Sequence, residues 1–169
     1  MTPEPNPIPP WKDELDAIVA ARHGGALAQT LPRLRALAAR YPDVAEIHYQ
    51  IAWTCDSNDA SADAIPHYDK AIALGLESES LAGAMLGLGS SLRVAGQFEC
   101  SERVLREAVE RFPDHNEFRA FLALTLHDLG RHAEALSIAL TTLVDTADDP
   151  GITAYQRALR YYAEELGKK

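Results

Sequence analysis

The sequence has few cysteines and no long apolar run. Cys55 and Cys100 are the only cysteines among 169 residues, and they form no close motif. Two such distant thiols do not make a disulfide framework, and the placement of Cys55 at an apolar position favours a reduced, cytoplasmic protein. No stretch approaches the roughly 20 apolar residues that a membrane-spanning helix needs. The sequence therefore predicts no membrane partner.

Positive charge is also scarce. The 16 lysines and arginines face 25 acidic residues, so the formal net charge is -9, and the isoelectric point is about 5.1. A nucleic-acid partner would need a basic face, so this balance argues against one. The first ten residues have no basic start and no apolar core, so we expect no signal peptide there.

Motifs for catalysis or metal binding are missing as well. No two of the six histidines stand four residues apart beside a carboxylate, as a helical metal site would require. The chain has no G-x-S-x-G motif, no phosphate-binding glycine loop and no C-x-x-C. We therefore expect no enzyme activity, no cofactor and no metal.

The chain does contain an internal repeat with a period of about 34 residues. Leu88-Gly89 is matched by Leu122-Ala123, Leu92 by Leu126, and Gly96 by Gly130. Apolar residues recur at helical spacing before each turn glycine, and a second apolar helix follows it. Neither helix is long enough to be stable alone, so the units must stack to cover their apolar stripes.

This period and the positions of the turn glycines resemble the tetratricopeptide repeat, a helix–turn–helix unit. The resemblance is strongest over 82–149, good over 45–78 and weakest over 11–44. It implies an all-α fold, a right-handed superhelical solenoid of about nine antiparallel helices, in four repeats plus a C-terminal capping helix. The small residues Gly89 and Ala123 would then allow close helix approach, and Asn58-Asp59 would replace a turn glycine.

Three segments follow from this organisation. Residues 1–10 are rich in proline and predict a disordered tail, residues 11–149 the repeat domain, and residues 150–169 a C-terminal capping helix. The apolar residues of the last helix are spaced three and four apart and predict one buried stripe: Ile152, Tyr155, Leu159, Tyr162 and Leu166.

The resemblance also implies which residues line the concave groove. In this family certain positions of the first helix of each repeat face the groove. They correspond here to Glu46, Tyr49, Trp53, Asp56, Leu86, Ser90, Arg93, Leu124 and His127. Tyr49 and Trp53 share a helix face and predict an aromatic floor, whose alternative role is packing against neighbouring helices. The lysine and asparagine clamp of co-chaperone members is absent.

These features predict a non-enzymatic scaffold that holds a protein or peptide segment. Residues 43–80 carry eight acidic side chains and one basic residue, so the expected ligand is an apolar segment flanked by Lys or Arg. Two alternatives remain open. The chain could be a self-assembling structural module, a homo-oligomer whose groove is filled by its own chain, or a regulatory accessory subunit of an enzyme complex.

Overall fold

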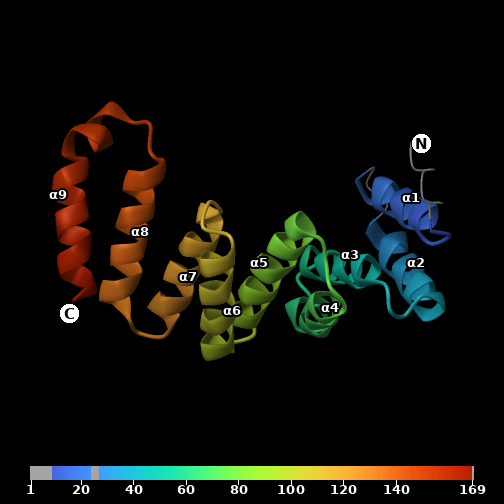
Figure 1. Cartoon of the computed structure of the whole chain (residues 1–169). Helices are drawn as coiled ribbons and strands as arrows, with labels where there is room; N and C mark the ends of the chain where they lie inside the picture. Colours follow the sequence, from blue (N-terminus) through green and yellow to red (C-terminus); the bar gives the residue numbers. More distant parts are fainter. Residues whose placement is uncertain (1–8, 24–26, 169) are drawn as a thin grey trace, which may run out of the picture. The chain divides into compact units, whose positions relative to one another are not determined.

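The computed structural model describes residues 9–23 and 27–168, and these residues form helices and turns without a strand. The chain divides into two compact units, residues 1–81 and 82–169. Figure 1 labels the helices of both units. The expected proline-rich tail lies almost entirely outside the described residues.

The first unit contains four helices, namely α1 Lys12–His23, α2 Leu27–Arg40, α3 Ala45–Asp56 and α4 Ser61–Leu74. Neighbours in the chain pack against one another, from α1 on α2 to α3 on α4. The core is made of fully buried apolar side chains from all four helices: Ile18, Leu34, Leu37, Ile47, Ile51 and Tyr68. The turn between α3 and α4 uses Asp59 at a φ of 57°, so an aspartate takes the left-handed position where the repeat elsewhere has glycine.

The helix α5, Ser78–Val94, starts at the end of the first unit and lies mostly in the second. It is followed by α6 Phe98–Arg111, α7 Asn116–Asp128, α8 His132–Thr146 and α9 Pro150–Gly167. The helices α6 to α9 each pack against the next, so that α7, α8 and α9 lie side by side (Figure 1). Leu105, Phe118 and Leu126 are fully buried between them.

The repeat positions explain this packing. The turns after α5 and α7 place Gly96 and Gly130 at φ values of 74° and 76°, where other residues would be strained. A Cβ atom at Gly89 would lie 2.7 Å from the Leu105 side chain, so only glycine allows α5 and α6 to approach this closely. Glu102 and Glu134 bind the guanidinium groups of Arg106 and Arg131, and these ion pairs connect α6 with α8.

The last helix differs from the expectation for its apolar stripe. Ala163 is its buried residue, and Ile152, Leu159 and Leu166 are half-buried against α8. Tyr155 and Tyr162 are 70% and 60% exposed, so the prediction that they are buried is wrong. A helix with one neighbour buries only a narrow strip, and the two tyrosines lie beside that strip.

Within the described residues no helix is long and apolar enough to cross a membrane. The same residues contain no group of three His, Cys, Asp or Glu side chains that could hold a metal ion.

Candidate functional site

The first candidate site is a strip along α3 in the first unit. Glu46, Tyr49, Trp53 and Asp56 follow one another at intervals of three and four residues, so they lie along one side of the helix. Trp53 is 37% exposed and the other three are half-buried. We call these four residues the α3 strip.

Arg22 on α1 lies directly against this strip. Its guanidinium carbon is 3.6 Å from the centre of the Trp53 ring. Its two terminal nitrogens donate hydrogen bonds to Thr54 Oγ1 at 3.0 Å and to Gln50 Oε1 at 2.9 Å. Because Arg22 is only 5% exposed, it covers the inner face of the indole and leaves the outer part of Trp53 to solvent.

The electrostatics of the strip follow from burial. Desolvation lowers the pKa of Arg22 to about 10, so the guanidinium is still charged at neutral pH. Burial raises the pKa of Tyr49, whose ring lies 6.3 Å from that of the buried Tyr68. Asp56 accepts a hydrogen bond from Ser61 Oγ at 2.9 Å, so this carboxylate is engaged by α4. Glu46 is therefore an acidic group of the α3 strip, and the charged Arg22 lies directly beneath Trp53.

The other predicted groove residues lie in the second unit. Leu86, Ser90 and Arg93 are half-buried on α5, and Arg93 forms an ion pair of 2.8 Å with Asp128 of α7. Leu124 and His127 on α7 are exposed. They line an open groove between α7 and α8.

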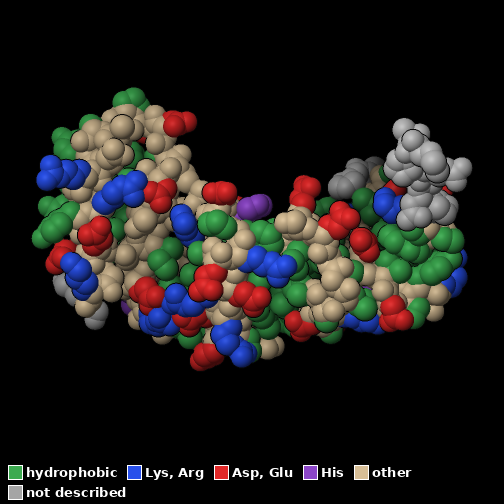
Figure 2. Space-filling model, in the orientation of Figure 1, with side chains coloured by type: hydrophobic (Ala, Val, Ile, Leu, Met, Phe, Trp, Pro, Cys, Tyr) green, Lys and Arg blue, Asp and Glu red, His purple; other side chains and the backbone are tan. Residues whose placement is uncertain are grey.

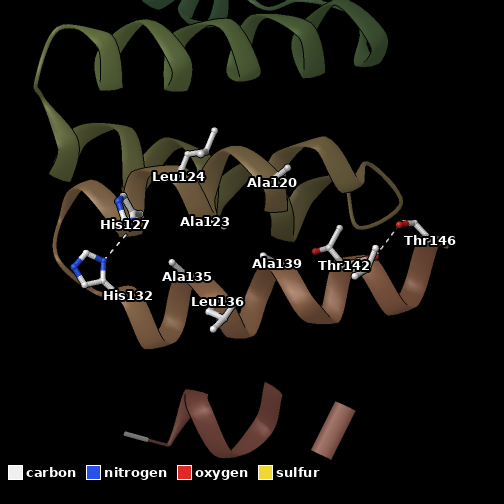
Figure 3. A pocket seen from close by; sticks show the side chains of 11 residues that line it. Ala120, Ala123, Leu124, His127, His132, Ala135, Leu136, Ala139, Thr142 and Thr146 are labelled. Carbon is white, nitrogen blue, oxygen red and sulfur yellow. Dashed lines mark hydrogen bonds between the residues drawn. The ribbon is translucent and has the colours of Figure 1, made fainter. Parts of the chain in front are cut away.

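This groove has a volume of about 570 Å³ and is shown in Figure 3. Its small residues are Ala120 and Ala123 from α7 with Ala135 and Ala139 from α8. The remaining lining residues are Leu124, His127, His132, Leu136, Thr142, Leu143 and Thr146. None of the lining residues is Asp, Glu, Lys or Arg. We call it the α7–α8 groove.

Two imidazole rings stand at one end of the α7–α8 groove. The Nδ1 atoms of His127 and His132 are 3.1 Å apart, as the dashed line in Figure 3 shows. One ring donates and the other accepts, so a single proton joins them. The other end of the groove is lined by the hydroxyl-bearing Thr142 and Thr146.

Sequence reasoning misses three parts of these surfaces. It does not predict that Arg22 packs under Trp53, because the two residues belong to different repeats and only the fold brings them together. It does not single out Leu136 and Leu143, although their spacing places them on one face of a helix. The exposure of Tyr155 and Tyr162 cannot be read from their spacing.

Paired antiparallel helices that recur with a period of about 34 residues define a helical-repeat protein. More specifically, the chain belongs to the tetratricopeptide repeat family, because that family's model, described as "Tetratrico peptide repeat", matches residues 45–166. The expected family and the expected all-α fold class are thus confirmed. The matched span leaves out residues 11–44, the stretch with the weakest resemblance.

Solved structures agree with this assignment. The chain is similar to YrrB, described as a TPR protein with an unusual peptide-binding site, with a TM-score of 0.69 and 20% identity over 90% of this chain and 80% of that one. It is also similar to MamA, with a TM-score of 0.69 and 18% identity over 96% and 93% of the two chains.

A third similar structure is PilF from Pseudomonas aeruginosa, with a TM-score of 0.66 and 18% identity over 92% of this chain and 72% of that one. At these identities the likeness concerns the fold. No curated protein matches the chain in sequence.

Proposed function

We propose that the protein is a non-enzymatic scaffold that binds a protein or peptide segment on the α3 strip. The observation that carries this proposal is the position of Trp53, which is 37% exposed while its inner face is fixed by the buried guanidinium of Arg22. An aromatic side chain that is already held in place loses little conformational entropy on binding. Large aromatic anchors of this kind dominate the energetics of many interfaces.

The chemistry of the strip indicates the class of ligand. An apolar side chain of the partner packs on the outer part of Trp53 and on Tyr49. A Lys or Arg next to it reaches Glu46, which is half-buried in the same strip. Exposed charge pairs are worth only about 0–1 kcal/mol each, so the aromatic residues carry the affinity and Glu46 contributes selectivity. The likeness to YrrB, whose description names a peptide-binding site, supports a peptide ligand.

We also place this scaffold in the cytoplasm. Cys55 and Cys100 are both free, and Cys55 is only 1% exposed in the core of the first unit. Burial raises the pKa of the Cys55 thiol and keeps it protonated and unreactive. Free thiols of this kind suit a reducing compartment.

The test begins with peptides selected from a random display library on the full chain. Trp53 and Trp11 are the two tryptophans, so in a Trp11→Phe background the fluorescence of Trp53 reports binding directly. We expect Trp53→Ala to weaken the selected peptides by about 2 kcal/mol or more, roughly 30-fold, when binding is measured by calorimetry.

Leu74→Ala is the matched control, because Leu74 is an apolar residue of the same unit with the same 37% exposure. It should leave the affinity unchanged. Circular dichroism of Trp53→Ala should show wild-type helix content. Peptides that bind Trp53→Ala as tightly as the wild type, or a Trp53→Ala variant that unfolds, would assign Trp53 to packing and refute the proposed site.

A further inference from the structure

The second unit exposes large apolar side chains on three consecutive helices. Five of them are Leu124 of α7, Leu136 and Leu143 of α8, and Tyr155 and Tyr162 of α9, with 48%, 49%, 43%, 70% and 60% of each residue exposed. Monomeric soluble proteins rarely expose a large contiguous apolar patch. If these five side chains lie together, the surface that they form is therefore a candidate interface.

The ion pairs of the unit fix that placement. Asp145 of α8 binds Arg160 of α9 at 2.7 Å and Arg119 of α7 at 3.5 Å, so these three charges share one side of the helix layer. At about 100° per residue, Leu143 lies roughly 200° around α8 from Asp145. Tyr155 and Tyr162 lie roughly 140° and 200° around α9 from Arg160.

The leucines of α8 and the tyrosines of α9 therefore lie together on the side opposite to these ion pairs. The α7–α8 groove opens on the same side, because Leu136 and Leu143 line it. We call this surface the apolar face. The view in Figure 2 shows side chains of both charges over α6, α8 and α9, whereas the residues that line the groove include no Asp, Glu, Lys or Arg.

The preceding repeat shows what such a groove normally holds. Ser101 and Leu105 of α6 occupy the same repeat positions as Ala135 and Ala139 of α8, and both are fully buried. Ser101 Oγ lies 3.0 Å from Thr125 Oγ1, so α7 covers that groove. After α8 the equivalent positions are covered only in part within the described residues, since Ala135 is 7% exposed whereas Ala139 is exposed. The α7–α8 groove is thus shaped for a covering element that this unit does not itself supply.

We propose that a second copy of the chain covers the apolar face and forms a two-fold symmetric dimer. The face carries both halves of a complementary shape, a ridge made by Tyr155 and Tyr162 and a groove floored by four alanines. Leu136 and Leu143 lie between them. A two-fold axis near these leucines places the ridge of each copy in the groove of the other, which is the reciprocity that an isologous interface requires.

The composition and size of the face agree with this occupant. Homodimer interfaces are more apolar than interfaces between transient partners, and charged residues are depleted at their centre. Helices packed about 8–10 Å apart make a three-helix face on the order of 25 Å wide. At about 1.5 Å per residue, α8 is roughly 22 Å long. A flat face of these dimensions is about 550 Å², of the same order as the roughly 800 Å² of accessible surface that a standard interface takes from each partner.

The other end of the chain does not offer an alternative ridge. The exposed positions of α1 include Asp13, Asp16, Ala17 and Ala20, which are acidic or small. A head-to-tail stack would have to place this helix in the α7–α8 groove, with carboxylates against an apolar wall. The geometry therefore favours the two-fold arrangement over an open chain of copies.

The test measures the mass of the full chain in solution. We expect analytical ultracentrifugation at micromolar concentration to give twice the 18.5 kDa of one chain. The ridge variant Tyr155→Ser/Tyr162→Ser and the groove variant Ala120→Gln/Ala139→Gln, which changes two exposed lining residues, should each weaken the dimer by about 100-fold or more. Tyr161→Ser is the matched control, because Tyr161 is 58% exposed on the same helix and lies roughly 200° around it from the buried Ala163. Its ring contacts that of Tyr162 at 5.6 Å between centroids, so the control also measures the effect of losing this neighbour of the ridge.

Mixing the two variants distinguishes ridge-in-groove packing from any other dimer. A mixed dimer keeps one intact ridge and one intact groove that face each other, so it should form more tightly than either variant with itself. Far-UV circular dichroism checks that both variants stay folded. A monomeric wild type, an equal effect of Tyr161→Ser, or a mixture no tighter than its components would each overturn the proposal. The dimer does not depend on the α3 strip, so peptide binding there can succeed or fail independently.

Discussion

At the scale of single residues, Arg22 of α1 holds Trp53 of the α3 strip in place. A buried cation costs free energy unless other groups compensate it. Here two hydrogen bonds and the face of Trp53 compensate part of this cost. No carboxylate is among these contacts, and the buried Nε has no hydrogen-bond partner in the described residues. The cost of burial appears as a pKa lowered to about 10. Arg22 thereby orients Trp53 and stays charged, which places a cation behind the surface where the ligand is expected.

Gly89 shows how a single position sets the spacing between two helices. Alanine there would gain about 1 kcal/mol of helix propensity. The added Cβ would lie 2.7 Å from the fully buried Leu105 side chain, and overpacking of this kind costs about 1–3 kcal/mol. We therefore expect Gly89→Ala to lower the free energy of unfolding by about 1 kcal/mol, measured by urea denaturation.

The control for this prediction is the same change in a Leu105→Ala background. There the clashing atoms are gone, so Gly89→Ala should raise the free energy of unfolding. The two effects must differ in sign, which a double-mutant cycle measures directly. Equal effects in both backgrounds would mean that Gly89 and Leu105 are not coupled.

Residues of this kind divide into those that the sequence predicts and those that it does not. Gly89, Gly96 and Gly130 are predictable, because in a repeat with a fixed period each position can be compared with the equivalent position of the next copy. Arg22 is not, because its contact with Trp53 joins two helices at positions that no repeat relates. Leu124 and His127 follow from family positions, and their place in an open groove depends on what α9 leaves uncovered.

At the scale of helices, α9 shows how packing selects among apolar residues. Spacing alone assigns five residues to one stripe. In the structure Ala163 is buried, and Ile152, Leu159 and Leu166 are half-buried. Both tyrosines of the predicted stripe are exposed. Ser137 Oγ donates a 2.6 Å hydrogen bond to the Ala163 carbonyl oxygen, which requires close approach of the two helices. Only a small residue at position 163 permits that approach.

This close approach leads to a prediction for α9. Ala163→Glu would bury a carboxylate without a partner, which costs several kcal/mol, so we expect α9 to leave α8 instead. Hydrogen exchange should then show loss of protection across Pro150–Gly167, while α1 to α4 keep theirs. Ala154→Glu is the control, because Ala154 is exposed on the same helix. Equal protection in the two variants would show that Ala163 is not the docking residue.

At the scale of the whole molecule, charge and apolar surface act in opposite directions on self-association. Each copy has a formal net charge of -9, so two copies repel each other over distances of about a Debye length, roughly 10 Å at 0.1 M salt. The groove of the apolar face is lined by no Asp, Glu, Lys or Arg, so its attraction does not weaken when salt is added. Raising the salt concentration therefore screens the repulsion between the two copies and leaves the attraction from apolar burial unchanged.

We therefore expect the dissociation constant of the dimer to fall as sodium chloride rises from low to physiological concentration, measured by sedimentation at each salt level. Association through oppositely charged surfaces must respond in the reverse direction, because salt screens attraction between unlike charges. The monomeric ridge variant Tyr155→Ser/Tyr162→Ser carries the same net charge as the wild type, and it should remain monomeric at every salt level. A dissociation constant that rises with salt would assign the contact to ion pairs and would rule out the apolar face as its origin.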